Sequence, residues 1–217
     1  MNDYAAARLA MVDRQVRPSD VTAYPIIAAL LDVPRELFVP DAMKPIAYAG
    51  EHLPLGERRV LLDPWSFSKL IETVGIHRSD LVLDVGSGLG YSAAIIARLA
   101  AAVIALEEDP GMAAAAEETL GRIGADNAVV HAGRLADGAP EHGPYDVILI
   151  EGGVEEVPAA LTDQLKEGGR IAAIFSDGTF GQGRFGIKSG GVVAWRRVFD
   201  STAPILPGFE KAKTFEF

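Results

Sequence analysis

Apolar runs and helical stripes alternate along the chain from residue 80 onward. Short apolar runs bounded by polar residues are typical of buried strands, and apolar residues at every third or fourth position are typical of helices. The patterns predict strands at 81–85, 103–107, 127–133, 145–152 and 170–177, with helices at 92–100, 112–124 and 157–165. Two more strands, 184–189 and 192–201, flank Gly190 and Gly191, which predicts an antiparallel hairpin. The alternation predicts an α/β fold in which a mostly parallel sheet carries helices on both faces.

The first third of the chain has a different pattern. Apolar stripes predict helices at 4–16 and 21–31, the second capped by Thr22, and a third helix from Pro64 to near Gly75. The segment 35–64 contains four prolines and few periodic runs. We therefore expect it to be irregular chain that lies over the rest of the protein, not a separate domain.

Composition excludes several classes of function. The 217 residues are 49% hydrophobic and 23% charged, which is typical of a compact globular protein. With 30 acidic and 20 basic residues the net charge is -10, which disfavours nucleic acid and anionic membranes as partners. The absence of cysteine excludes disulfides, thiol catalysis and cysteine-ligated metals. His52, His77, His131 and His142 show no metal-ligand spacing, so we expect no metal site.

Two features favour a cytoplasmic protein. The longest nearly apolar stretch, 91–106, is interrupted by Arg98 and is shorter than the ~20 residues that a membrane-spanning helix needs. The first residues carry acids and bases where a secretory signal peptide has an unbroken apolar core.

A glycine-rich turn follows the first strand of the regular region. Gly86, Gly88 and Gly90 fit GxGxG, whereas the dinucleotide fingerprint GxGxxG needs its third glycine at Tyr91, so the spacing disfavours a dinucleotide. Glycines allow a tight turn and close approach to a ligand, and the next helix offers unpaired backbone N–H groups. The turn alone fits a ligand cradle and a plain tight turn equally well.

The next strand ends in three acids, and this changes the balance. Glu107 lies about twenty residues after the first glycine, where a carboxylate can accept hydrogen bonds from both hydroxyls of a ribose. The alternative is that Glu107, Glu108 and Asp109 only solvate a loop and favour the start of the next helix. A ligand with a ribose and no phosphate suits such a turn in an acidic protein, and S-adenosylmethionine fits that description. The candidate cofactor-binding residues in these two segments are Asp84, Gly86, Ser87, Gly88, Gly90, Tyr91, Glu107 and Glu108.

The chain resembles the protein-L-isoaspartate O-methyltransferase family of S-adenosylmethionine-dependent methyltransferases. The resemblance rests on VPRELFVPDAMKPIAYAGEHLPLG (33–56), VLDVGSGLGYSAAIIARL (82–99) and VIALEED (103–109), and runs from about Met11 to Gly191. It implies a Rossmann-like, seven-stranded methyltransferase sheet, S-adenosylmethionine as cofactor, and methyl transfer to the isoaspartyl carboxylate of damaged proteins. It also implies a single domain over 1–217, with a helical and acceptor-loop extension at 1–77 and a cofactor-binding core at 78–217. The last segment, 202–217, does not resemble the family's usual ending.

Two positions depart from the family pattern. The segment resembling PIGxGxTISxP is PLGERRVLLDP (54–64), which places Leu62 where the resemblance implies a catalytic serine and leaves the catalytic residues unknown. Arg134 stands where the family has an aspartate that would accept the adenine amino group, and arginine is no hydrogen-bond acceptor. Arg58 and Arg59 are either solvated loop charges or contacts for the methyl-accepting carboxylate.

Three functions remain open on the sequence. The first is an isoaspartyl methyltransferase. The second is a family member that binds S-adenosylmethionine or a protein partner without turnover, which Leu62 and Arg134 favour. The third is a methyltransferase with a different carboxylate or small-molecule acceptor. The sequence predicts no oligomeric state.

Overall fold

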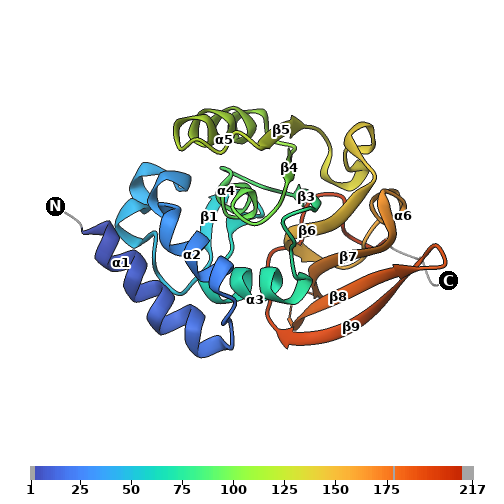
Figure 1. The fold of residues 1–217 in the computed structure, drawn as a ribbon, viewed down its shortest axis with the longest axis horizontal. Coiled ribbons are helices and arrows are strands. Elements are labelled where there is room, and N and C mark those ends of the chain that lie inside the picture. Colours follow the sequence, from blue (N-terminus) through green and yellow to red (C-terminus); the bar gives the residue numbers. More distant parts are fainter. Residues whose placement is uncertain (1–2, 178, 212–217) are drawn as a thin grey trace.

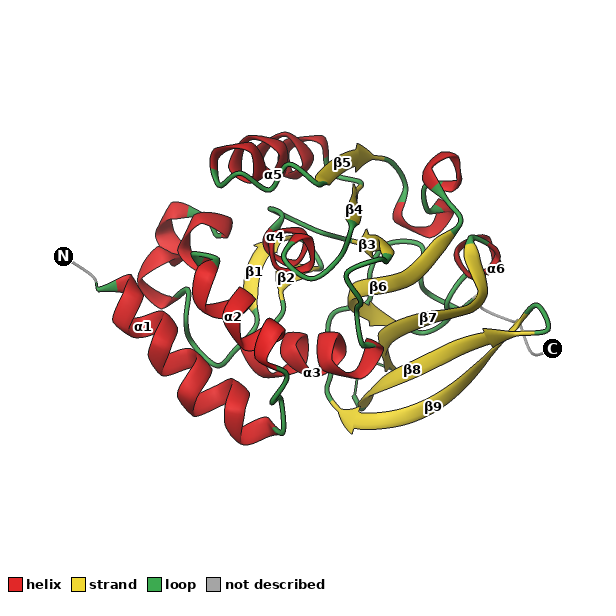
Figure 2. Cartoon of the chain, in the orientation of Figure 1, coloured by secondary structure: helices red, strands yellow, loops and turns green. Residues whose placement is uncertain are grey.

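A seven-stranded sheet forms the centre of the computed structural model, which describes residues 3–177 and 179–211 (Figures 1 and 2). The strands lie in the order β5-β4-β3-β6-β7-β8-β9. They are β3 (Leu81–Val85), β4 (Ala102–Glu107), β5 (Ala128–Ala132), β6 (Tyr145–Val154), β7 (Leu165–Ser176), β8 (Gly181–Ser189) and β9 (Val192–Asp200). The first five are parallel, and β8 and β9 add antiparallel to one side. The predicted Rossmann-like fold with a C-terminal hairpin is confirmed.

Six α-helices and several short turns connect the strands in the described part of the chain. The helices are α1 (Tyr4–Met11), α2 (Tyr24–Asp32), α3 (Pro64–Val74), α4 (Tyr91–Ala97), α5 (Pro110–Arg122) and α6 (Ala159–Asp163). The shorter helical segments are the π-helix η1 (Val12–Val16) and the 3-10 helices η2 (Arg17–Ser19), η3 (Arg35–Phe38), η4 (Asp41–Ile46), η5 (Leu135–Asp137) and η6 (Pro140–His142). The first helices lie together at one end of the molecule, opposite the β8–β9 hairpin (Figure 1).

Three sequence predictions about these elements were wrong. Helix α2 begins at Tyr24 with Ala23 as its N-cap, so Thr22 does not cap it; Pro25 sets the first turn instead. Helix α6 has only five residues, because the chain from Leu165 onward already pairs as β7. The segment 35–64 is not wholly irregular, since β1 (Leu53–Gly56) and β2 (Arg59–Leu61) form an antiparallel hairpin.

The hydrophobic core lies on both faces of the sheet. Successive strand residues point to opposite faces. Val82 therefore belongs to the cluster formed with α1 to α5, whereas Leu83 belongs to a second cluster. In the second cluster Leu206 and Phe209, from the chain after β9, pack with residues of η5 and α6. A segment at the far end of the described sequence thus covers one face of the parallel strands.

Among the described residues, no helix is long and apolar enough to cross a membrane.

Candidate cofactor site

The glycine turn lies at the carboxyl end of β3, between the ends of β4 and β6. Gly86, Gly88 and Gly90 have φ angles of 82°, 57° and 93°, a left-handed conformation that glycine adopts without strain. The backbone N–H of Gly86 donates to the carbonyl of Leu106 at 2.9 Å, which joins the turn to β4. In open α/β sheets, ligands bind at such an edge where neighbouring strands connect in opposite directions.

Glu107 ends β4 with a fully buried carboxylate beside this turn. Its oxygens accept backbone hydrogen bonds from Gly88 at 2.7 Å and from Glu108 and Asp109 at 2.9 Å each. Asp109 in turn caps α5 by accepting from the N–H of Met112. Three backbone donors fix the position of the Glu107 carboxylate, so it has the chemistry expected of a residue that accepts hydrogen bonds from a ribose.

Both oxygens of the Glu107 carboxylate accept hydrogen bonds from Arg59. Its Nη1 and Nη2 atoms donate to Oε1 and Oε2 of Glu107 at 2.7 and 2.6 Å, which is a bidentate ion pair. The Arg59 side chain is only 7% exposed. The hairpin β1–β2 thus sends a cation from the first third of the chain into the candidate site.

Two further acids are buried near the turn. Asp84 accepts a hydrogen bond from Ser92 through Oδ2 at 2.6 Å, but its Oδ1 has no hydrogen-bond partner among the described residues. Oε1 of Glu151, in β6, is likewise unpartnered within 3–177 and 179–211. Burial, and then the nearby charge of Glu107, raises the pKa of Asp84 to about 7. Burial and the charge of Asp84 also raise the pKa of Glu151 well above its usual value.

Side chains of the chain itself fill the space beside the glycine turn. A methyl group added at Gly88 would lie 2.7 Å from Cδ1 of Leu55, and one added at Gly86 would lie 3.4 Å from both Nη2 of Arg59 and Cδ1 of Leu206. Leu206 is buried, and its N–H donates to the carbonyl of Gly153 at 2.9 Å. The space at the carboxyl ends of these strands, where a cofactor would bind, is therefore filled by side chains.

Among the remaining predicted site residues, Ser87 lies within the turn, Tyr91 follows it directly, and the others lie in other segments. Tyr91 is buried between the rings of Phe38 and Phe67, with centroid distances of 5.8 and 5.6 Å. Arg134 is exposed and lies 3.7 Å from the carboxylate of Asp137. Glu108 is exposed, whereas Ser87 is buried and Leu62 is 1% exposed. Arg58 forms an ion pair with Glu210 at 2.6 Å.

Glu151, Leu55 and Leu206 were not among the residues predicted for the site. Glu151 had a signal, because an acid that interrupts the apolar run of a buried strand requires an explanation. Leu206 had none, because one leucine in an irregular segment is compatible with any environment.

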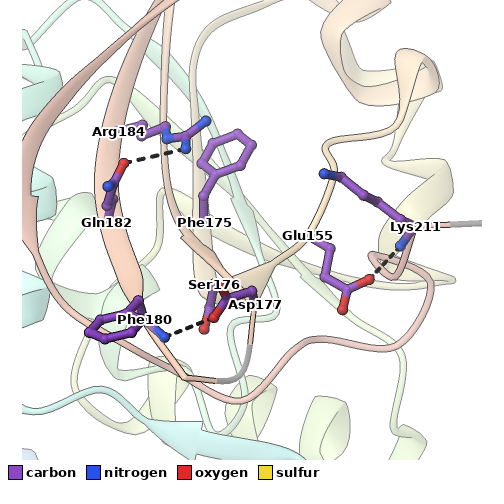
Figure 3. A pocket seen from close by; sticks show the side chains of 8 residues that line it. All are labelled: Glu155, Phe175, Ser176, Asp177, Phe180, Gln182, Arg184 and Lys211. Carbon is purple, nitrogen blue, oxygen red and sulfur yellow. Dashed lines mark hydrogen bonds between the residues drawn. The ribbon is translucent and has the colours of Figure 1, made fainter.

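A pocket of about 330 Å³ lies further along the same edge, at the ends of β7 and β8. Arg184 and Glu155 approach it from opposite sides (Figure 3). The guanidinium of Arg184 lies over the ring of Phe175, 4.5 Å from its centroid. The residues that line this pocket do not include the glycine turn or Glu107.

His131 comes together with the adjacent residues Glu141 and His142. One ligand atom from each lies within 4.8 Å of the others. Strand β5 and turn η6 create this proximity, which the spacing along the chain does not show.

A family model and two sequence relatives all point to one protein family. The sequence model of the family "Protein-L-isoaspartate(D-aspartate) O-methyltransferase (PCMT)" matches residues 8–179. The protein-L-isoaspartate O-methyltransferase of Methanoculleus marisnigri is 37% identical over 163 residues, which are 75% of this chain and 74% of that protein. Protein-L-isoaspartate O-methyltransferase 1 of Syntrophobacter fumaroxidans is 33% identical over 180 residues, or 82% of this chain and 83% of that protein.

Solved structures show the same similarity. A protein-L-isoaspartate O-methyltransferase superposes with a TM-score of 0.80 at 26% identity, over 93% of this chain and 66% of that chain. A Plasmodium falciparum protein in complex with S-adenosyl-L-homocysteine superposes with a TM-score of 0.75, over 95% of this chain and 99% of that chain. At 18% identity, this second likeness shows the fold alone.

Proposed function

Because this chain belongs to the protein-L-isoaspartate O-methyltransferase family, we propose that it transfers a methyl group from S-adenosylmethionine to an isoaspartyl carboxylate in damaged proteins. The observation that carries the proposal is the family match over residues 8–179, which spans the glycine turn and Glu107. In this proposal residues 1–77 provide the acceptor loop and residues 78–217 the cofactor-binding core.

This reaction makes few demands on side chains. A carboxylate with an ordinary pKa of about 4 is ionised at neutral pH, so no general base is needed to activate it. The protein has to hold the acceptor in position and exclude water. The lack of a hydroxyl at Leu62 is therefore compatible with methyl transfer, provided that other groups orient the acceptor carboxylate.

The site has hydrogen-bonding groups that suit the cofactor, but it lacks the space to hold it. Glu107 and the glycine turn have the chemistry to bind a ribose. However, Arg59 holds both oxygens of Glu107, and Leu55 and Leu206 pack against the turn. As arranged here the residues do not fit S-adenosylmethionine, and we assign no catalytic step to them in this arrangement.

The same observation favours a second candidate function, a family member that has lost turnover. Such a protein retains the fold and Glu107 while its own arginine replaces the ligand. Leu62, buried and without a hydroxyl, is consistent with this alternative.

The partner in the main proposal is a protein or peptide bearing isoaspartyl residues, and the location is the cytoplasm. The net charge of -10 supports a partner other than nucleic acid or an anionic membrane.

The deciding experiment measures methyl transfer from radiolabelled S-adenosylmethionine to an isoaspartyl peptide, with the same peptide carrying normal aspartate as control. Label in the isoaspartyl peptide alone supports the proposal. Absence of label in both peptides, although the protein binds S-adenosylmethionine, contradicts it and leaves the second candidate.

A further inference from the structure

We infer that the chain carries its own occupant of the cofactor site, formed by Arg59 and Leu206, and that S-adenosylmethionine binds only when this internal occupant is displaced. The inference rests on the proposed function, because it concerns the same site. Three independent features of the structure carry it: the hydrogen-bond pattern at Glu107, the charge at the site, and the attachment of the segment 201–209.

The hydrogen-bond pattern at Glu107 matches that expected for a ribose. A ribose diol presents two adjacent donors to the two oxygens of a carboxylate. The two terminal nitrogens of Arg59 present two donors to the same oxygens, at 2.7 and 2.6 Å. The remaining capacity of Glu107 is used by three backbone N–H groups. A diol and the Arg59 guanidinium therefore compete for one position.

The charge of Arg59 matches that of the expected cofactor. Asp84, Glu107 and Glu151 bring three buried carboxyl groups to this edge. Buried carboxylates need a cationic partner or must take up protons. S-adenosylmethionine would supply a sulfonium, and the guanidinium of Arg59 supplies the same charge from within the chain. Bringing in the cofactor while Arg59 remains would place two cations among these three carboxyl groups.

Leu206 closes the apolar side of the site. A methyl group added at Gly152 would lie 2.6 Å from Cγ of Leu206, so the leucine lies directly on the backbone of β6. The segment is held there by backbone pairing, in which Gly153 donates to Pro204 at 2.8 Å and Leu206 donates to Gly153. Phe209, fully buried, accepts from the N–H of Glu155. The segment 201–209 thus forms an isolated parallel β-bridge with the end of β6, between Ile205 and Gly153.

The two parts of the internal occupant are tied to each other. Arg58, next to Arg59, forms an ion pair with Glu210 at 2.6 Å. His52, just before β1, lies with Nε2 2.7 Å from the carbonyl oxygen of Thr202. The hairpin and the segment after β9 thus share contacts on both sides of Leu206, so movement of one loosens the other.

The test measures binding of S-adenosylhomocysteine by titration calorimetry to the whole chain and to Arg59→Gln, Leu206→Ala and the double variant. Matched controls are Arg170→Gln, which breaks an ion pair with Asp80, and Leu161→Ala, which truncates a buried leucine of the same cluster. Circular dichroism establishes that each variant is folded. We expect each site variant to bind at least tenfold more tightly than the wild type, the double variant more tightly still, and the controls to show no gain.

Wild-type binding that neither site variant improves would overturn the inference, and so would a folded double variant that does not bind. If the double variant does not fold, Arg59→Gln combined with Leu206→Val removes the cation and truncates the leucine less, and the absence of any gain in that variant has the same force. Methyl transfer to the isoaspartyl peptide is measured separately. Variants that gain S-adenosylhomocysteine binding but transfer no methyl group support the inference and contradict the proposed function.

Discussion

The buried guanidinium of Arg35 donates a hydrogen bond from Nη2 to the main-chain carbonyl of Leu62 at 2.7 Å. Its Nε donates to the carbonyl of Ala47 at 2.8 Å, so one fully buried side chain joins two loops. The chain at Leu62 is fixed by this contact, and the leucine side chain itself is 1% exposed within the main apolar cluster. Leu62 is thus a core residue.

Leu62→Ser should destabilise the protein. The substitution leaves a cavity and a buried hydroxyl, so we expect the free energy of unfolding to fall by about 2–5 kcal/mol. Urea denaturation measures this. Leu62→Met, which conserves volume, should cost less than about 1.5 kcal/mol. Equal stability of the serine variant and the wild type would show that this side chain is not packed as described.

Arg59→Met should also be costly, because it leaves the Glu107 carboxylate buried without its cation. Removing one partner of a buried pair costs about 3–5 kcal/mol. The double variant Arg59→Met with Glu107→Gln should recover part of this loss, since glutamine is neutral and still accepts backbone hydrogen bonds. Urea denaturation of the two single variants and the double variant measures the coupling. Strictly additive losses would contradict a direct ion pair.

Stability should depend on pH through Asp84. Because its pKa is about 7 in the folded protein and 3.8 ordinarily, the folded state holds a proton that the unfolded state has released. The free energy of unfolding should therefore fall as pH rises from about 4 to about 7. Asp84→Asn carries no charge and can still accept from Ser92, so it should flatten this slope and add roughly 2–4 kcal/mol at pH 8.

Asp146→Asn is the matched control for Asp84→Asn. Burial alone would raise the pKa of Asp146, but hydrogen bonds from Leu81 and Lys166 lower it below its usual value. Its contribution to stability is present above about pH 4 and is lost as pH falls further. Neutralising it should reduce stability at pH 7. A stabilising Asp146→Asn together with a destabilising Asp84→Asn would reverse the assignment.

Arg58 lies at a turn position that strains its backbone. Its φ is 56°, in the left-handed region that favours glycine. The Arg58–Glu210 pair is more than two-fifths exposed on both sides, so it contributes little. Arg58→Gly should therefore be more stable than Arg58→Ala by about 1 kcal/mol, because both lose the pair and only glycine relieves the strain. Thermal denaturation compares them, and a more stable alanine variant would contradict this expectation.

The strand and helix order from residue 80 onward could be predicted from the sequence because each element has its own periodicity. The glycine turn and Glu107 could be found because their spacing follows from that order. The role of Arg59 could not, because its contact with Glu107 joins residues 48 positions apart through a hairpin that a proline-rich segment conceals. The position of Leu206 depends on a single backbone pairing with Gly153, for which an irregular segment has no pattern.

The segment 201–209 follows all seven strands in the chain, and this has a consequence for biosynthesis. The ribosome releases residues in order, so β3, β4 and β6 can pair before Leu206 and Phe209 emerge. Until then the ends of β3, β4 and β6 lack their cover, while the hairpin that carries Arg59 is already complete. The part of the internal occupant that carries Arg59 is therefore synthesised before the three strands, and the part that carries Leu206 is synthesised after them.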